Sequence, residues 1–144
     1  MGILAGAKPV LIATAALAVL VGCDKSPPVP NAAPVVAGVD AVSCADRVCE
    51  VVLRVVDADA DPVDLDVQCV RDAGACTLTD AAGTDGRSGL EPDRAPPGRT
   101  HYLRLGVDGP EATENLKLRL LPTDARGLAG DAYTSPAFTL QSGL

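Results

Sequence analysis

The sequence predicts an all-β domain, a β-sandwich, preceded by a signal peptide and a proline-rich tether. From about Val39, apolar and polar residues alternate with a period of two in several short runs. Turn-forming residues separate these runs, and no stretch shows the apolar stripe of an amphipathic helix. Six or seven short strands over about 100 residues are typical of a sandwich.

Four runs carry the alternation most clearly. Their apolar faces are Val51, Leu53 and Val55; Val63, Leu65, Val67 and Cys69; His101, Leu103, Leu105 and Val107; and Leu116, Leu118 and Leu120. Polar residues such as Asp64, Asp66 and Lys117 take the alternate positions, as expected for strands with one buried face. Residues 75–79 and 137–140 are shorter candidates for strands.

The N-terminal segment predicts export. Lys8 precedes an apolar run, residues 9–22, which is shorter than the roughly 20 residues that span a bilayer and has the length of a signal-peptide core. The run ends Leu20-Val21-Gly22-Cys23, which resembles the lipobox of bacterial lipoproteins. This resemblance implies that residues 1–22 are removed and that Cys23 carries fatty acyl chains such as palmitate. The alternative is an ordinary signal peptide with a coincidental cysteine.

Residues 23–37 are predicted to form a tether. Pro27, Pro28, Pro30 and Pro34 prevent a helix and favour an extended, polyproline-like chain. At about 3.1 Å per residue, a dozen such residues would lift the following domain roughly 35–40 Å from the bilayer. Residues 38–144 are then expected to form the sandwich.

Composition limits the function classes. The net charge is −7 and the sequence contains no cluster of lysine and arginine, so a nucleic-acid partner is not expected. The aromatic residues are Tyr102, Tyr133 and Phe138, so aliphatic side chains must fill the core.

The remaining cysteines are Cys44, Cys49, Cys69 and Cys76, and an even number in an exported chain predicts disulfides. Local pairing of Cys44 with Cys49 and of Cys69 with Cys76 is favoured, because each pair flanks a plausible hairpin tip. The alternative joins Cys49 to Cys69 across the two sheets. A zinc site is not expected, because the spacings are wider than Cys-x₂-Cys.

An acidic cluster follows Val56. Asp57, Asp59 and Asp61 alternate as at the start of a calcium loop. An EF-hand would continue with glycine at position six and glutamate at position twelve, where this chain has proline and glutamine. A solvated turn without a cofactor is the favoured interpretation. The alternative is a looser calcium (Ca²⁺) site between strands, as in cadherin-like sandwiches, with these three carboxylates as ligands.

The part of the chain after the tether carries a further resemblance. Its segments read, in order, DADADPVDLDVQC, GL, HYLRL and NLKLRLLPTDARGLAGDAYTSPAFTL. They resemble the fibronectin type III or immunoglobulin-like repeats of bacterial surface and envelope proteins, from about Val39 to the C-terminus. The resemblance implies the fold but not a particular function, because this sandwich hosts many unrelated roles. The chain differs from better-known members in having no tryptophan.

No enzymatic activity is expected. His101 is the single histidine, at a position predicted to face the core, and no G-x-S-x-G elbow is present. We therefore expect a lipoprotein anchored to the bilayer of the outer or inner membrane through Cys23. Its expected role is noncovalent, in adhesion, structure or the binding of an unidentified envelope protein or glycan. The alternative is a calcium-dependent binding module that uses the aspartates after Val56.

Overall fold

The alternating pattern folds into strands throughout the part of the chain that the computed structural model describes, residues 30–71, 76–108 and 115–140. The predicted signal peptide and Cys23 lie outside these residues. The strands are β1 (Val35–Ala45), β2 (Val48–Val56), β3 (Val63–Val70), β4 (Thr77–Asp80), β5 (Arg99–Asp108), β6 (Lys117–Asp124) and β7 (Tyr133–Thr134). No helix is present among the described residues, and the predicted all-β class is confirmed.

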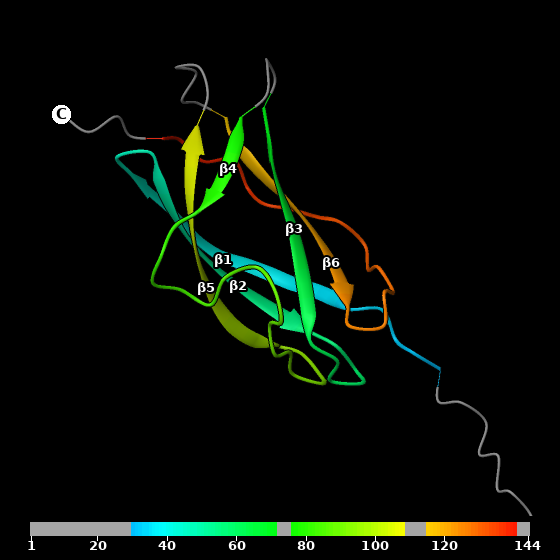
Figure 1. The fold of residues 1–144 in the computed structure, drawn as a ribbon. Helices are drawn as coiled ribbons and strands as arrows, with labels where there is room; N and C mark the ends of the chain where they lie inside the picture. The colour runs from blue at the N-terminus through cyan, green and yellow to red at the C-terminus, as the bar shows by residue number, and fades with distance from the viewer. Residues whose placement is uncertain (1–29, 72–75, 109–114, 141–144) are drawn as a thin grey trace, which may run out of the picture.

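Two antiparallel sheets pack against each other as a sandwich (Figure 1). One sheet has the strand order β1-β2-β5-β4, and the other has the order β3-β6-β7. The β1–β2 hairpin closes through Asp46 and Arg47, whose φ angles are 49° and 62°. Positive φ at both central residues is the requirement of a type I′ turn, which matches the twist of the strands that it joins.

The predicted apolar faces form the core between the sheets. Leu53 on β2, Leu103 on β5 and Leu120 on β6 are all at most 1% exposed. The main cluster contains only aliphatic residues among its buried members, with Tyr133 and Phe138 packed at its margin. The sandwich therefore holds together largely by interlocking leucine and valine side chains, whose burial contributes about 1.5–3 kcal/mol each.

Both cystines lie at one end of the sandwich. Cys44 faces Cys49 across the β1–β2 hairpin with their Cα atoms 4.0 Å apart, and Cys69 is bonded to Cys76 with a Cα separation of 5.6 Å. The structure thus has the local pairing and not the Cys49–Cys69 alternative. The hairpin expected at the second pair is absent from the described residues, because β3 and β4 belong to different sheets and this disulfide links them. The four cysteines contribute to one small apolar cluster with Leu116, so the disulfides close the core at this end.

Some of the predicted strand and domain boundaries differ from the structure. The strand expected at residues 75–79 begins later, at Thr77. Residues 137–140 form no strand, and Phe138 makes only an isolated bridge to Leu116. Pro136 interrupts the pairing along β6 there because proline has no N–H to donate. The first strand begins at Val35, three residues before the predicted start of the domain, because the preceding Pro34 is already buried.

Candidate functional site

The acidic turn, residues 57–61, connects β2 in one sheet to β3 in the other. Asp57 is fully buried, and its Oδ1 atom accepts hydrogen bonds from the backbone N–H groups of Asp59 at 2.8 Å and Asp61 at 3.4 Å. Its own N–H donates to the carbonyl oxygen of Asp93 at 2.9 Å. An aspartate carboxylate that accepts from the following backbone is a common turn motif, which explains why this sequence bends here.

The three predicted carboxylates converge. One oxygen atom from each of Asp57, Asp59 and Asp61 lies within 4.8 Å of the others. Asp59 Oδ2 also accepts a hydrogen bond from the backbone N–H of Ala32 at 2.6 Å, and Asp61 Oδ2 lies 3.0 Å from Nε of Arg126. The structure therefore brings together all three sequence-predicted ligands, and it adds the segment before β1 and the β6–β7 loop to the same site.

A buried aspartate that the sequence analysis missed supports the same end of the sandwich. Asp124 is 4% exposed; its Oδ1 accepts from the N–H groups of Arg126 and Leu128, and its Oδ2 accepts from Nδ2 of Asn31 at 2.5 Å. Burial would raise the pKa of Asp124, but hydrogen bonds from Leu128, Asn31 and Arg126 and the Arg126 charge hold that pKa below its ordinary value. Asp124 thus stays ionised and fixes the entry of the chain into the domain.

The solvated character expected for the turn holds only in part. Asp64 and Asp66, on the outer face of β3, are exposed as predicted. Asp57 is not solvated, and its Oδ2 atom is buried without a hydrogen-bond partner, as is Oδ1 of Asn31. The period-two pattern could not show this, because residues distant in the sequence cover the turn.

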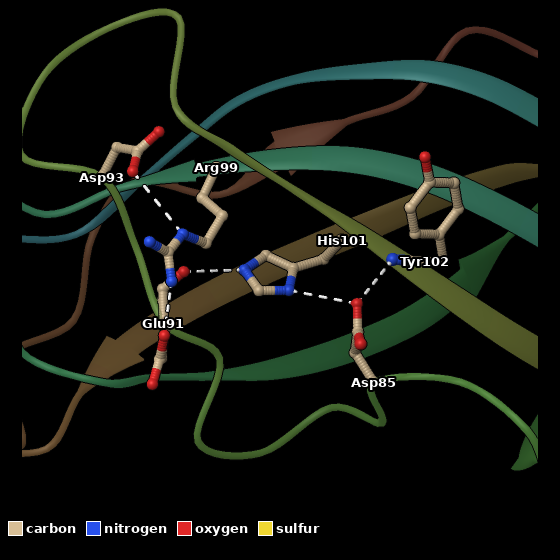
Figure 2. A network of polar contacts seen from close by, with 6 residues as sticks. All are labelled: Asp85, Glu91, Asp93, Arg99, His101 and Tyr102. Atoms are coloured by element: carbon tan, nitrogen blue, oxygen red, sulfur yellow. Dashed lines mark hydrogen bonds and ion pairs between the residues drawn. The ribbon is translucent and has the colours of Figure 1, made fainter.

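A second polar network surrounds His101 on β5 (Figure 2). His101 is 6% exposed; Nδ1 lies 3.2 Å from Oδ2 of Asp85, and Nε2 lies 2.8 Å from the carbonyl oxygen of Glu91. Arg99 forms ion pairs with the carboxylates of Glu91 and Asp93 beside it. The buried, hydrogen-bonded histidine expected from the sequence is therefore present, and both of its ring nitrogens have partners.

An open hollow of about 350 Å³ lies over this network and is lined by Asp85, Gly89, Leu90, Glu91, Arg99, Thr100 and His101. The imidazole at its base is engaged on both sides, so neither ring nitrogen is available to a substrate. The network holds the loop between β4 and β5 against β5. This arrangement serves the packing of the loop.

Asp85→Asn should make stability less dependent on pH in the acidic range. The backbone N–H of Tyr102 lowers the pKa of Asp85; burial opposes this, and the hydrogen bond and charge of His101 add to the lowering. Because the pKa of Asp85 is lower in the folded state than the ordinary value of 3.8, the ionised carboxylate stabilises the fold at pH values above 3.8. This stabilisation is lost as the pH falls through the folded-state pKa. The carboxylate is 47% exposed, so we expect it to contribute less than about 1 kcal/mol to the free energy of unfolding.

Urea denaturation at pH 6 and at pH 3 measures this effect. The difference in the free energy of unfolding between the parent and Asp85→Asn should be present at pH 6 and should shrink at pH 3. Asp66→Asn, which removes an exposed carboxylate from β3, is the matched control and should show little difference at either pH. A difference for Asp85→Asn that grows on acidification would contradict the assignment.

Comparisons of the chain with protein-family models, with curated proteins and with solved structures found no match. Among the described residues, no helix has the length and apolar character needed to cross a membrane.

Proposed function

We propose that this chain is an exported lipoprotein, cleaved before Cys23 and anchored in a membrane of the cell envelope by acyl chains on that residue. Its sandwich would act as a noncovalent binding, adhesion or structural module. The observation that supports the proposal is the pairing of all four remaining cysteines in two disulfides between cysteines close in the sequence. Such disulfides persist in oxidising compartments, in agreement with the LVGC motif of an exported precursor.

We also propose that the sandwich is immunoglobulin-like. Taken in chain order, the strands are arranged A-B-E-D in one sheet and C-F-G in the other, which is the order of constant-type immunoglobulin domains. The chain departs from antibody domains in lacking the tryptophan and the disulfide between strands B and F. This chain instead has one disulfide across the β1–β2 hairpin and one that links the end of β3 to the residue before β4, both at one end of the sandwich.

The shape of the domain supports a role in presenting one end outward. The segment before β1 leaves the sandwich beside the end of β6, whereas the β1–β2 hairpin tip lies at the opposite end (Figure 1). Asn31, already bonded to Asp124, is eight positions after Cys23, so this connection spans at most about 29 Å. That is shorter than a free tether ending at residue 37. The cystine end would therefore face away from the bilayer, toward an envelope protein or glycan.

A noncovalent role agrees with the His101 network. The single histidine of the chain is buried, and both ring nitrogens are occupied by Asp85 and the Glu91 backbone. General base catalysis needs a nitrogen within hydrogen-bond reach of the substrate proton. The geometry therefore gives His101 a structural role, in agreement with a noncovalent function for the domain.

Cys23→Ser tests the anchor. The substitution should abolish acylation and leave either an uncleaved precursor or a released protein, because the lipid is attached through the thiol of this cysteine. Mass spectrometry of the intact chain and detergent phase partitioning provide the measurement. The double variant Cys44→Ser/Cys49→Ser is the control and should remain acylated. If Cys23→Ser enters the detergent phase fully at the mass of the parent protein, the lipoprotein assignment is wrong.

A further inference from the structure

We propose that the acidic turn is a binding site for a divalent cation of the calcium type, with Asp57, Asp59 and Asp61 as carboxylate ligands. The first reason is the state of Asp57. Its side chain is 0% exposed and its Oδ2 atom has no hydrogen-bond partner. A buried carboxylate oxygen without a partner has lost its hydration without compensation, whereas a bound cation would supply that compensation.

The charges at the turn also favour a cation. Three carboxylates converge there, and the guanidinium that reaches them is that of Arg126, 3.0 Å from Asp61 Oδ2. This guanidinium also interacts with the Asp124 carboxylate, so it balances at most one of the three charges. At least two negative charges remain, which makes a doubly charged ion more suitable than a sodium or potassium ion.

The donor atoms favour calcium. All the converging side chains are aspartates, so the site offers the hard oxygen ligands that Ca²⁺ and Mg²⁺ prefer. Calcium binds oxygen at about 2.3–2.6 Å, so ligands on opposite sides of the ion are about 4.6–5.2 Å apart. The carboxylate oxygens already lie within 4.8 Å of one another. Magnesium demands a near-ideal octahedral geometry and loses its water ligands reluctantly, so a cluster of protein carboxylates suits calcium better.

The segment before β1 is positioned to complete the site. Ala32 donates its N–H to Asp59, and the neighbouring Asn31 has a buried Oδ1 atom without a partner. An amide oxygen is a common calcium ligand, so Asn31 is a candidate for a fourth protein ligand. Bound calcium would then hold the entry segment, the β2–β3 turn and the β6–β7 loop together, through Asn31, Asp59 and the Asp61–Arg126 pair.

Calcium titration of the full chain in detergent, after removal of metals with EDTA, tests the proposal. Calorimetry should give one binding event per chain. At one hundred times the dissociation constant, the melting temperature should rise by about 10 °C. Magnesium should bind at least about tenfold more weakly, because it tolerates irregular geometry poorly and retains its water ligands. The measurement does not depend on the lipid anchor, so it can succeed or fail separately from the lipoprotein proposal.

Two variants and one control assign the site. Asp57→Asn keeps an oxygen for the backbone hydrogen bonds but removes the charge, and Asp59→Asn does the same at a half-buried position that tolerates change more easily. Each should weaken calcium binding at least about tenfold, as expected when one of three carboxylate ligands is lost. Asp66→Asn removes the same charge from the exposed face of β3 and should bind calcium as the parent does.

Three outcomes would overturn the proposal. The first is the absence of both heat and stabilisation at millimolar calcium in the parent protein. The second is an equal loss of binding in Asp66→Asn and Asp59→Asn, which would mean that calcium only screens surface charge. The third is equal stabilisation by sodium chloride at the same ionic strength. If Asp57→Asn does not fold, Asp59→Asn decides the question alone.

Discussion

Replacing Leu53 with alanine is expected to lower the free energy of unfolding by about 2–5 kcal/mol. Leu53 is 0% exposed on β2, an inner strand of its sheet, opposite Val39 on β1 and His101 on β5. Its side chain packs among other aliphatic side chains of the core. No large aromatic ring is among the buried residues of that cluster to shift into the space, so the cavity should persist and the full cost should be observed.

Chemical denaturation of the parent and the variant measures the loss in the free energy of unfolding. The dependence of that free energy on denaturant concentration, the slope m, should be the same for both proteins. Val52→Ala is the matched control, because Val52 directly precedes Leu53 on β2 but is only half-buried, on the other face. This substitution should lower the free energy of unfolding by less than about 1 kcal/mol. Equal losses for the two variants would mean that the inward and outward faces of β2 are not distinguished as the structure has them.

Strands with one buried face could be predicted, because burial on one side of a pleated strand imposes a period of two on the sequence. β2, β3, β5 and β6 follow this rule along their length. β7 has only two residues, too few to show any period. The start of β1 was missed because Pro34 belongs to a proline-rich segment by composition, although tertiary contacts bury it.

The ligand residues of the candidate site could be predicted, but their environment could not. The alternation of Asp57, Asp59 and Asp61 is visible in the sequence. Their burial depends on contacts made by residues far along the chain, including the Asp93 carbonyl. Asn31 meets Asp124 across 93 positions, and no local pattern marks such a pair. The turn signal at Gly127 could have suggested that the preceding aspartate bonds its own backbone, as it does.

The cysteine spacing predicted the local pairs, but it did not predict that both cystines share one apolar cluster with Val107, Leu116 and Leu140. We therefore expect the contributions of the two disulfides to stability to be coupled. Removal of either disulfide, as Cys44→Ala/Cys49→Ala or as Cys69→Ala/Cys76→Ala, should cost roughly 2 kcal/mol by the loop-entropy relation for short loops. The two losses should not add independently, because the cystines pack on the same small group of side chains.

A double-mutant cycle in urea measures this coupling. The variant without both disulfides should differ from the sum of the two separate losses by about 0.5 kcal/mol or more. Strict additivity would contradict a shared cluster. The cycle should be measured with a reduced parent sample as a reference, since reduction removes both bonds without changing any side chain volume in the core.

Digestion without reduction tests the connectivity on which this prediction rests. Trypsin can cut the denatured chain after Arg47 and after Arg71, inside the two loops. The local pairing keeps the peptide that ends at Arg47 joined to 48–54, and keeps 55–71 joined to 72–87. A cross-sheet pairing would instead join 48–54 to 55–71 through Cys49 and Cys69. The masses differ, so one mass spectrum distinguishes the two pairings. Four free thiols would argue against both disulfides and against the oxidising compartment that the proposed export requires.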